Sequence, residues 1–168
     1  MSSIDIDTLL APVSEDTPCG EDLSDLTEYY VLQDLITFQE PSQFAEEAPE
    51  EPDWAAVRDR AVDLLARGKE LQVVVWLIHA VTKIDGMEGL RDGLAVLKGL
   101  IENHWEEIYP QLDEEDENPA LERVNILRML SSGIAEGEEI SDFVHALRDM
   151  PLCDSRQLGR FSWRDLKT

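Results

Sequence analysis

The densest run of potential ligands in the chain is acidic, with five carboxylates in succession from Asp113 to Glu117. Hard divalent cations prefer clustered carboxylate oxygens, so the residue types would suit a calcium site. The helix-loop-helix calcium template, however, needs glycine at its sixth position and glutamate at its twelfth, where this chain has Asn118 and Val124. Because like-charge runs usually stay in water, we expect a solvated loop between two helices.

The histidines and cysteines form no recognisable ligand or nucleophile motif. His79 and His104 are too far apart for a local zinc motif, and neither has a histidine or cysteine partner at ligand spacing. We expect His79 in the core or at its boundary and His104 beside Trp105 near a helix end. Cys19 and Cys153 have no flanking catalytic motif, and we expect free thiols because the sequence shows no secretory signal.

No other motif assigns a reaction. The chain has no Gly-x-Ser-x-Gly elbow, and its glycines at 86, 89, 93 and 99 follow no phosphate-loop pattern. A carboxylate dyad of the glycosidase type stays open as an alternative, because so many acids make some close pair inevitable. We expect a protein that is not an enzyme and that has no cofactor and no metal site.

The charge distribution narrows the class of partner. The formal net charge is −23, and the span from Met1 to Val57 holds fifteen acids and no lysine or arginine. Such a surface repels phosphate and anionic headgroups, so we expect no nucleic acid partner and no direct membrane insertion. No apolar run approaches the roughly 18 residues of a membrane span. We expect a cytoplasmic protein that meets other proteins, with an acidic adaptor mimicking nucleic acid as an alternative.

The elements that must position these residues are helical by their apolar spacing. A helix is predicted over 90–108, where apolar residues recur at steps of three and four. The segment 71–81 has the β-branched content of a strand, but no second strand could pair with it, so we expect a central helix that is apolar all round. Further helices are predicted over 24–38, from an Asp53 cap to Gly68, and over 121–130 and 140–147.

The predicted fold class is all-α, a compact multi-helix bundle with a long acidic loop over about 40–53 and an irregular C-terminal tail. Gly86 to Leu90 is predicted as a turn between helices. A chain of 168 residues suits one well-buried core, so we expect a single domain over 1–168, with approximate limits 4–165. Apolar helix faces close either within one chain or across a two-fold axis, so a homodimer is one possible state.

The tail alternates bases with aromatic residues. Exposed aromatic side chains beside arginines are typical of interface hot spots, which predicts that the tail contacts a partner or a downstream region of a longer protein. The alternative is that both rings pack back onto the bundle, which is the commoner fate of large apolar side chains. The predicted contact residues are Arg156, Arg160, Phe161, Trp163 and Arg164.

Several segments, in their order and spacing, resemble the ImpA N-terminal domain, which opens the TssA subunit of the bacterial type VI secretion system. The most specific is the run from Trp105 to Pro110 followed by acids. The others are Pro18 to Leu23, Pro52 to Trp54, Trp76-Leu77, Asp85 to Leu90, Pro119 to Arg123 and Leu158 to Asp165.

This resemblance implies a non-catalytic assembly role, in baseplate priming and in polymerisation of the sheath and tube. The implied partners are the baseplate, sheath, tube and membrane-complex subunits of the secretion system. Complete family members have further C-terminal regions, including one that builds a ring, so the resemblance implies an isolated N-terminal domain. Relatives that cap the far end of the sheath share the domain and stay open as an alternative.

Overall fold

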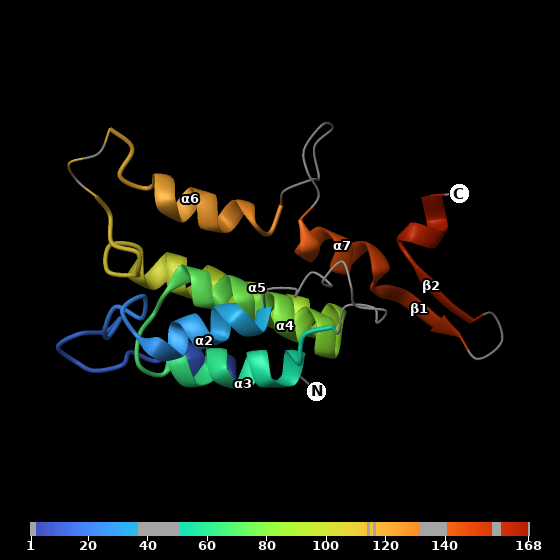
Figure 1. Ribbon diagram of the computed structural model, residues 1–168, viewed down its shortest axis with the longest axis horizontal. Coiled ribbons are helices and arrows are strands. Elements are labelled where there is room, and N and C mark those ends of the chain that lie inside the picture. Colours follow the sequence, from blue (N-terminus) through green and yellow to red (C-terminus); the bar gives the residue numbers. More distant parts are fainter. Residues whose placement is uncertain are drawn as a thin grey trace, which may run out of the picture.

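Helices dominate the computed structural model, which describes residues 3–36, 51–113, 115, 117–131, 141–155 and 159–167. Within these residues the chain forms seven α-helices, a two-stranded antiparallel hairpin and a final 3-10 turn (Figure 1). The predicted all-α class is confirmed. The elements are α1 (Ile6–Leu10), α2 (Thr27–Ile36), α3 (Trp54–Leu65), α4 (Leu71–Asp85), α5 (Met87–His104), α6 (Leu121–Arg128), α7 (Asp142–Asp149), β1 (Pro151–Ser155), β2 (Gly159–Ser162) and η1 (Arg164–Lys167).

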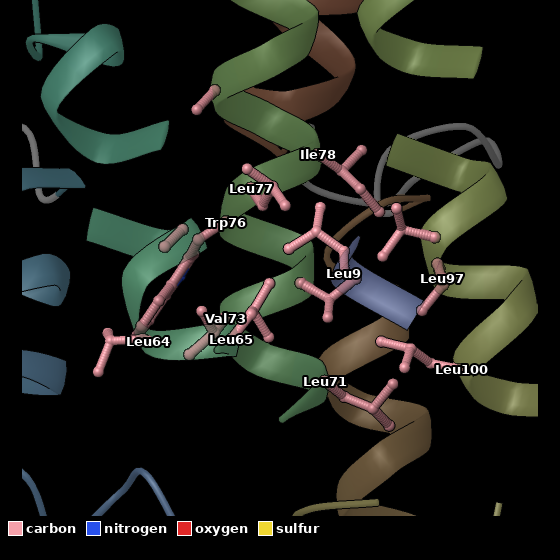
Figure 2. Packing of buried hydrophobic residues seen from close by; sticks show 14 of the residues in the cluster. Leu9, Leu64, Leu65, Leu71, Val73, Trp76, Leu77, Ile78, Leu97 and Leu100 are labelled. Atoms are coloured by element: carbon pink, nitrogen blue, oxygen red, sulfur yellow. The ribbon is translucent and has the colours of Figure 1, made fainter. Parts of the chain in front are cut away.

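Helix α4 forms the centre of the molecule. It packs most extensively against α5 and α3, and α6 and α7 also contact it. Ten of its fifteen residues are buried, including Trp76, Leu77 and Ile78. Figure 2 shows Leu9 and Leu97 converging on this helix from α1 and α5. The prediction of a central helix rather than a strand is therefore confirmed, because the β-branched run is covered by helices on several sides.

Helix α3 begins where the sequence places its cap. The Asp53 carboxylate accepts hydrogen bonds of 3.1 Å from the backbone N–H groups of both Ala55 and Ala56. These bonds satisfy two donors that have no partner within the helix, and they fix the start of α3 at Trp54. The predicted Asp53 cap is confirmed.

The turn between α4 and α5 is shorter than predicted. It is confined to Gly86, whose φ of 62° lies in the left-handed region that glycine adopts without steric cost. Helix α5 begins at the next residue, so Gly89 and Leu90 lie inside the helix rather than in the turn. The absence of a side chain at Gly89 lets α5 approach α4, because a Cβ there would lie 2.0 Å from the Val81 carbonyl oxygen.

The connection from α5 to α6 is fixed by a buried arginine. Helix α5 ends at His104, four residues earlier than predicted, and Ile108 is buried in the connection that follows. The guanidinium of Arg123 donates to the carbonyl oxygens of Pro110 at 2.7 Å, Ile108 at 2.6 Å and Trp105. It also lies over the Trp105 ring, 4.7 Å from the centroid. One side chain from α6 thus satisfies three carbonyls of an irregular segment.

Other differences from the sequence predictions are local. The five-residue helix α1 was not predicted, and α2, α6 and α7 differ from their predicted bounds by a few residues. The tail predicted as irregular instead contains the hairpin β1–β2 and the turn η1. Most of the predicted acidic loop, residues 40–50, lies outside the described residues.

Candidate protein-interaction surface

The C-terminal hairpin extends away from the central helices of the bundle (Figure 1). It follows α7 directly and extends beyond the ends of the central helices at the right of Figure 1. Its strands pair antiparallel, with Cys153 opposite Phe161 and a register irregularity between Pro151 and Cys153. The backbone neighbours of β2 are chiefly β1 and η1. The hairpin therefore depends mainly on its own pairing for its shape.

Both predicted aromatic contacts are on the surface of this hairpin. Phe161 on β2 is 41% exposed, and Trp163, just after β2, is 51% exposed. Leu152 on β1 is also exposed. The alternative that both rings pack fully onto the bundle does not hold in this structure. We call Leu152, Phe161 and Trp163 the hairpin patch.

Polar contacts hold the end of the hairpin in place. The Arg164 guanidinium lies 3.0 Å from the Asp149 carboxylate at the end of α7, and both side chains are exposed. Asp165 accepts hydrogen bonds from the backbone N–H of Ser162 at 2.7 Å and from its hydroxyl at 2.9 Å. These bonds, the backbone one above all, lower the pKa of Asp165. The turn that carries Trp163 is therefore closed by two hydrogen bonds between Ser162 and Asp165 and joined to α7 by one ion pair.

The five predicted contact residues are not equally placed. Arg160, Phe161, Trp163 and Arg164 all lie on the exposed strand β2 or the turn after it. Arg156 lies outside the described residues. The structure thus brings four of the five together on one short segment, and their contact with a partner stays a prediction.

The remaining chemical candidates are separate from this surface. Asp113, Glu115 and Glu117 of the acidic run are exposed, as the prediction of a solvated loop requires. His79 on α4 contacts the Trp54 ring at 4.6 Å and the Phe143 ring at 5.7 Å between centroids. Burial, helped by the charge of Lys83, lowers the pKa of His79 to about 4, so the imidazole is neutral at neutral pH. His79 is therefore a boundary residue of the core.

One cluster was missed by the sequence analysis. Cys19, His104 and Glu107 come together between the N-terminal loop and the end of α5, and their ligand atoms all lie within 4.8 Å of one another. Both cysteines are free thiols, as predicted, with Cys19 buried and Cys153 exposed. Burial raises the pKa of the Cys19 thiol, Glu107 raises it further, and Lys69 and Arg123 oppose the shift. The only local signal was the three-residue step from His104 to Glu107, because Cys19 reaches them through the fold alone.

Among the described residues, no helix is long and apolar enough to cross a lipid bilayer.

The fold defines the class as an all-α bundle with a C-terminal hairpin. A family model described as "ImpA, N-terminal, type VI secretion system" matches residues 10–132. The chain therefore belongs to the ImpA N-terminal family of the type VI secretion system, and it is a TssA-like component. The resemblance of the sequence segments is confirmed.

Two known TssA proteins are similar to this chain. The chain is 34% identical over 163 residues to the type VI secretion system component TssA1 of Pseudomonas aeruginosa, covering 96% of this chain and 45% of that protein. A solved structure is similar with a TM-score of 0.73 and 29% identity. It is the N-terminal domain, including the conserved ImpA_N region, of TssA from Burkholderia cenocepacia, and the match covers 99% of this chain and 59% of that one. The chain thus spans about half the length of these relatives.

Proposed function

We propose that this chain is a non-catalytic, single-domain module by which a TssA-like protein attaches to other subunits of the type VI secretion system in the cytoplasm. Membership of the ImpA N-terminal family carries the proposal. It is supported by one continuous buried core that joins α1 to α5 with Phe143 of α7. The role extends to baseplate priming and to assembly of the sheath and tube, with baseplate, sheath, tube or membrane-complex subunits as partners.

The hairpin patch is the surface we propose for that attachment. Phe161 and Trp163 present two large rings on a support that is set off from the bundle, and Arg160 and Arg164 lie on the same segment. Aromatic and arginine side chains dominate the binding energy of protein interfaces. Arg160 and Arg164 also place positive charge near the C-terminal end of a chain with a net charge of −23, and Arg164 is paired there with Asp149. The segment therefore combines two exposed aromatic rings with arginines over five consecutive residues.

The attachment can be tested by pulldown with defined partners. Tagged 1–168 is incubated separately with purified baseplate, sheath, tube and membrane-complex subunits, and light scattering gives the number of copies in the bait. The proposal expects one of these subunits to be retained. It further expects the double variant Phe161→Ala/Trp163→Ala to weaken retention at least roughly 30-fold, since the truncation of even one hot-spot residue costs about 2 kcal/mol.

Tyr30 provides a matched control for this pulldown. It is an aromatic residue on α2 that is 54% exposed, comparable to Trp163, but it lies on the helical bundle rather than on the hairpin. Tyr30→Ala should retain the partner as the parent chain does. Equal retention of the parent and the hairpin double variant would reject the hairpin patch, and retention of none of the four subunits would reject the attachment role of this domain.

A further inference from the structure

Cys19, His104 and Glu107 offer a sulfur, a nitrogen and an oxygen ligand at one point in space. Their ligand atoms lie within 4.8 Å of one another. Ligand atoms around a tetrahedral zinc ion are roughly 3.3 to 3.8 Å apart, given bond lengths of about 2.0 to 2.3 Å. Small side-chain rotations would therefore bring the three groups to coordination distance. This proximity is not a consequence of sequence spacing, because Cys19 is distant from both other residues along the chain.

The backbone around Cys19 is held by hydrogen bonds to the segment that connects α3 to α4. The Cys19 carbonyl accepts a 2.8 Å hydrogen bond from the Lys69 backbone N–H, and Gly20 pairs with Gly68 in an isolated antiparallel bridge. Lys69 is itself buried, and its ammonium donates at 2.9 Å to the carbonyls of Leu9 and Leu65. The thiol therefore belongs to a loop whose backbone is hydrogen-bonded to Lys69 and paired with Gly68.

The other two ligands are fixed by the end of α5. The His104 carbonyl accepts hydrogen bonds from the Glu107 backbone N–H at 3.0 Å and from the Ile108 N–H at 2.8 Å. Arg123 holds the carbonyls of Trp105 and Ile108 on the same turn. His104 and Glu107 are therefore positioned by the same hydrogen-bonded turn, and pre-positioned ligands bind a metal with less loss of conformational freedom.

The surroundings allow an ion to enter. Cys19 is buried and His104 is half-buried, whereas Glu107 is exposed, so the cluster opens to solvent on the Glu107 side. The neighbouring side chains of Lys69 and Arg123 donate their hydrogen bonds to backbone carbonyls rather than to the three ligand atoms. The net charge of −23 also raises the local concentration of divalent cations around the molecule.

We propose that Cys19, His104 and Glu107 bind one Zn²⁺ ion, with water in the fourth position. The mixed sulfur, nitrogen and oxygen set suits Zn²⁺, whereas Ca²⁺ and Mg²⁺ prefer oxygen alone. On binding, the thiol loses its proton to solvent and the thiolate, the carboxylate and the neutral imidazole donate to the ion. The bound ion links the loop before α2 to the end of α5.

Cobalt substitution tests the site directly. Metal-free 1–168 is titrated with Co²⁺, and the spectrum is followed for tetrahedral d–d bands and for thiolate-to-cobalt charge transfer; Zn²⁺ is then added in competition. The proposal expects one ion per chain, a charge-transfer band, and its loss on addition of Zn²⁺. Cys19→Ser should abolish the band and weaken Zn²⁺ binding at least about 100-fold, more than loss of a supporting residue usually does. Cys153→Ser, which removes the exposed thiol, should leave both unchanged.

The second pair of variants keeps the test valid if the buried position does not tolerate serine. Glu107→Gln alters an exposed side chain, so it should fold normally while weakening Zn²⁺ binding about 10-fold or more. Glu106→Gln removes the neighbouring exposed carboxylate and should bind Zn²⁺ as the parent does. The absence of a charge-transfer band would overturn the proposal. So would equal Zn²⁺ affinity of the Glu107→Gln and Glu106→Gln variants.

Discussion

At the scale of single residues, the fold depends on a few charged groups that are buried within it. Arg123 is 1% exposed and Lys69 is 2% exposed. Both side chains donate hydrogen bonds to backbone carbonyl oxygens. Burial lowers the pKa of each, because it disfavours the charged form. Their hydrogen bonds to carbonyl oxygens of irregular segments compensate for this cost.

The arginine makes a testable contribution to stability. We expect Arg123→Met to lower the free energy of unfolding by about 3 kcal/mol, because the carbonyls of Trp105, Ile108 and Pro110 lose their donor. Urea denaturation measures the change. Arg60 on α3 is exposed, and Arg60→Met should change the free energy of unfolding by less than about 0.5 kcal/mol. Similar effects of the two substitutions would show that the guanidinium of Arg123 does not support the connection.

Glu70 predicts a pH dependence of stability. Its carboxyl group is buried at the start of α4, and burial, followed by the charge of Asp22, raises its pKa from 4.5 to about 7. Hydrogen bonds from Tyr29 and from the Leu23 backbone oppose the shift. Between about pH 4.5 and 7 the folded state therefore holds more protons at this site than the unfolded state. The free energy of unfolding should fall by about 3 kcal/mol as the pH rises through this window.

Comparison with Glu70→Gln isolates this effect. His79 has the opposite effect on the pH dependence of stability. Its pKa is lowered to about 4, so its contribution to stability rises as the pH increases from about 4 to 6.5. Subtracting the profile of the Glu70→Gln variant removes the His79 contribution, which both proteins share. We expect the difference between the two proteins to change by about 3 kcal/mol between pH 5 and pH 8. Parallel profiles would mean that Glu70 titrates normally in the folded state.

At the scale of elements, apolar spacing was enough to predict most of the bundle. The helix over 71–81 was predicted correctly because both flanking segments are helical and no second segment could pair with it as a strand. The hairpin was missed because its strands are four and five residues long, too short for a period of two to be distinctive. The five residues of α1 were too few for a helical period, and they are held instead by packing of Leu9 on the core.

Close contact between α4 and α5 also leads to a prediction. Gly89→Ala places a Cβ 2.0 Å from the Val81 carbonyl oxygen, so the two helices must separate. Gly99→Ala, in the same helix, meets the end of the flexible Leu10 side chain, which can move away. Both changes gain the same helix propensity. We expect Gly89→Ala to be less stable than Gly99→Ala by about 2 kcal/mol in thermal or urea unfolding. Equal stability would contradict the close approach of the helices.

The candidate sites show the same limit of sequence reasoning. Alternation of arginines with Phe161 and Trp163 was visible in the sequence, and the structure adds that both rings are exposed on a hairpin. The cluster of Cys19, His104 and Glu107 was not visible, because its first member approaches through contacts between segments distant in sequence. Contacts of this kind depend on how the bundle closes, and neither apolar spacing nor local motifs report them.

At the scale of the whole molecule, the helical core and the hairpin are two distinct parts of the structure. The core is continuous around α4, while the hairpin β1–β2 extends beyond the ends of the central helices (Figure 1). Most of the acidic residues that the structure describes lie on the helical bundle and its loops rather than on the hairpin. The hairpin carries exposed aromatic and basic residues together. In our proposal the bundle is therefore the support and the hairpin is the point of attachment.

Site-specific photo-crosslinking in cells that assemble the secretion system tests this attachment most directly. A photoreactive phenylalanine analogue replaces Phe161 in one strain and Tyr30 in another, and crosslinked products are identified by mass spectrometry. The account predicts that the Phe161 position captures a baseplate, sheath, tube or membrane-complex subunit and that the Tyr30 position does not. Capture of such a subunit from Tyr30 alone, or from neither position, would contradict the assignment of the hairpin as the attachment surface.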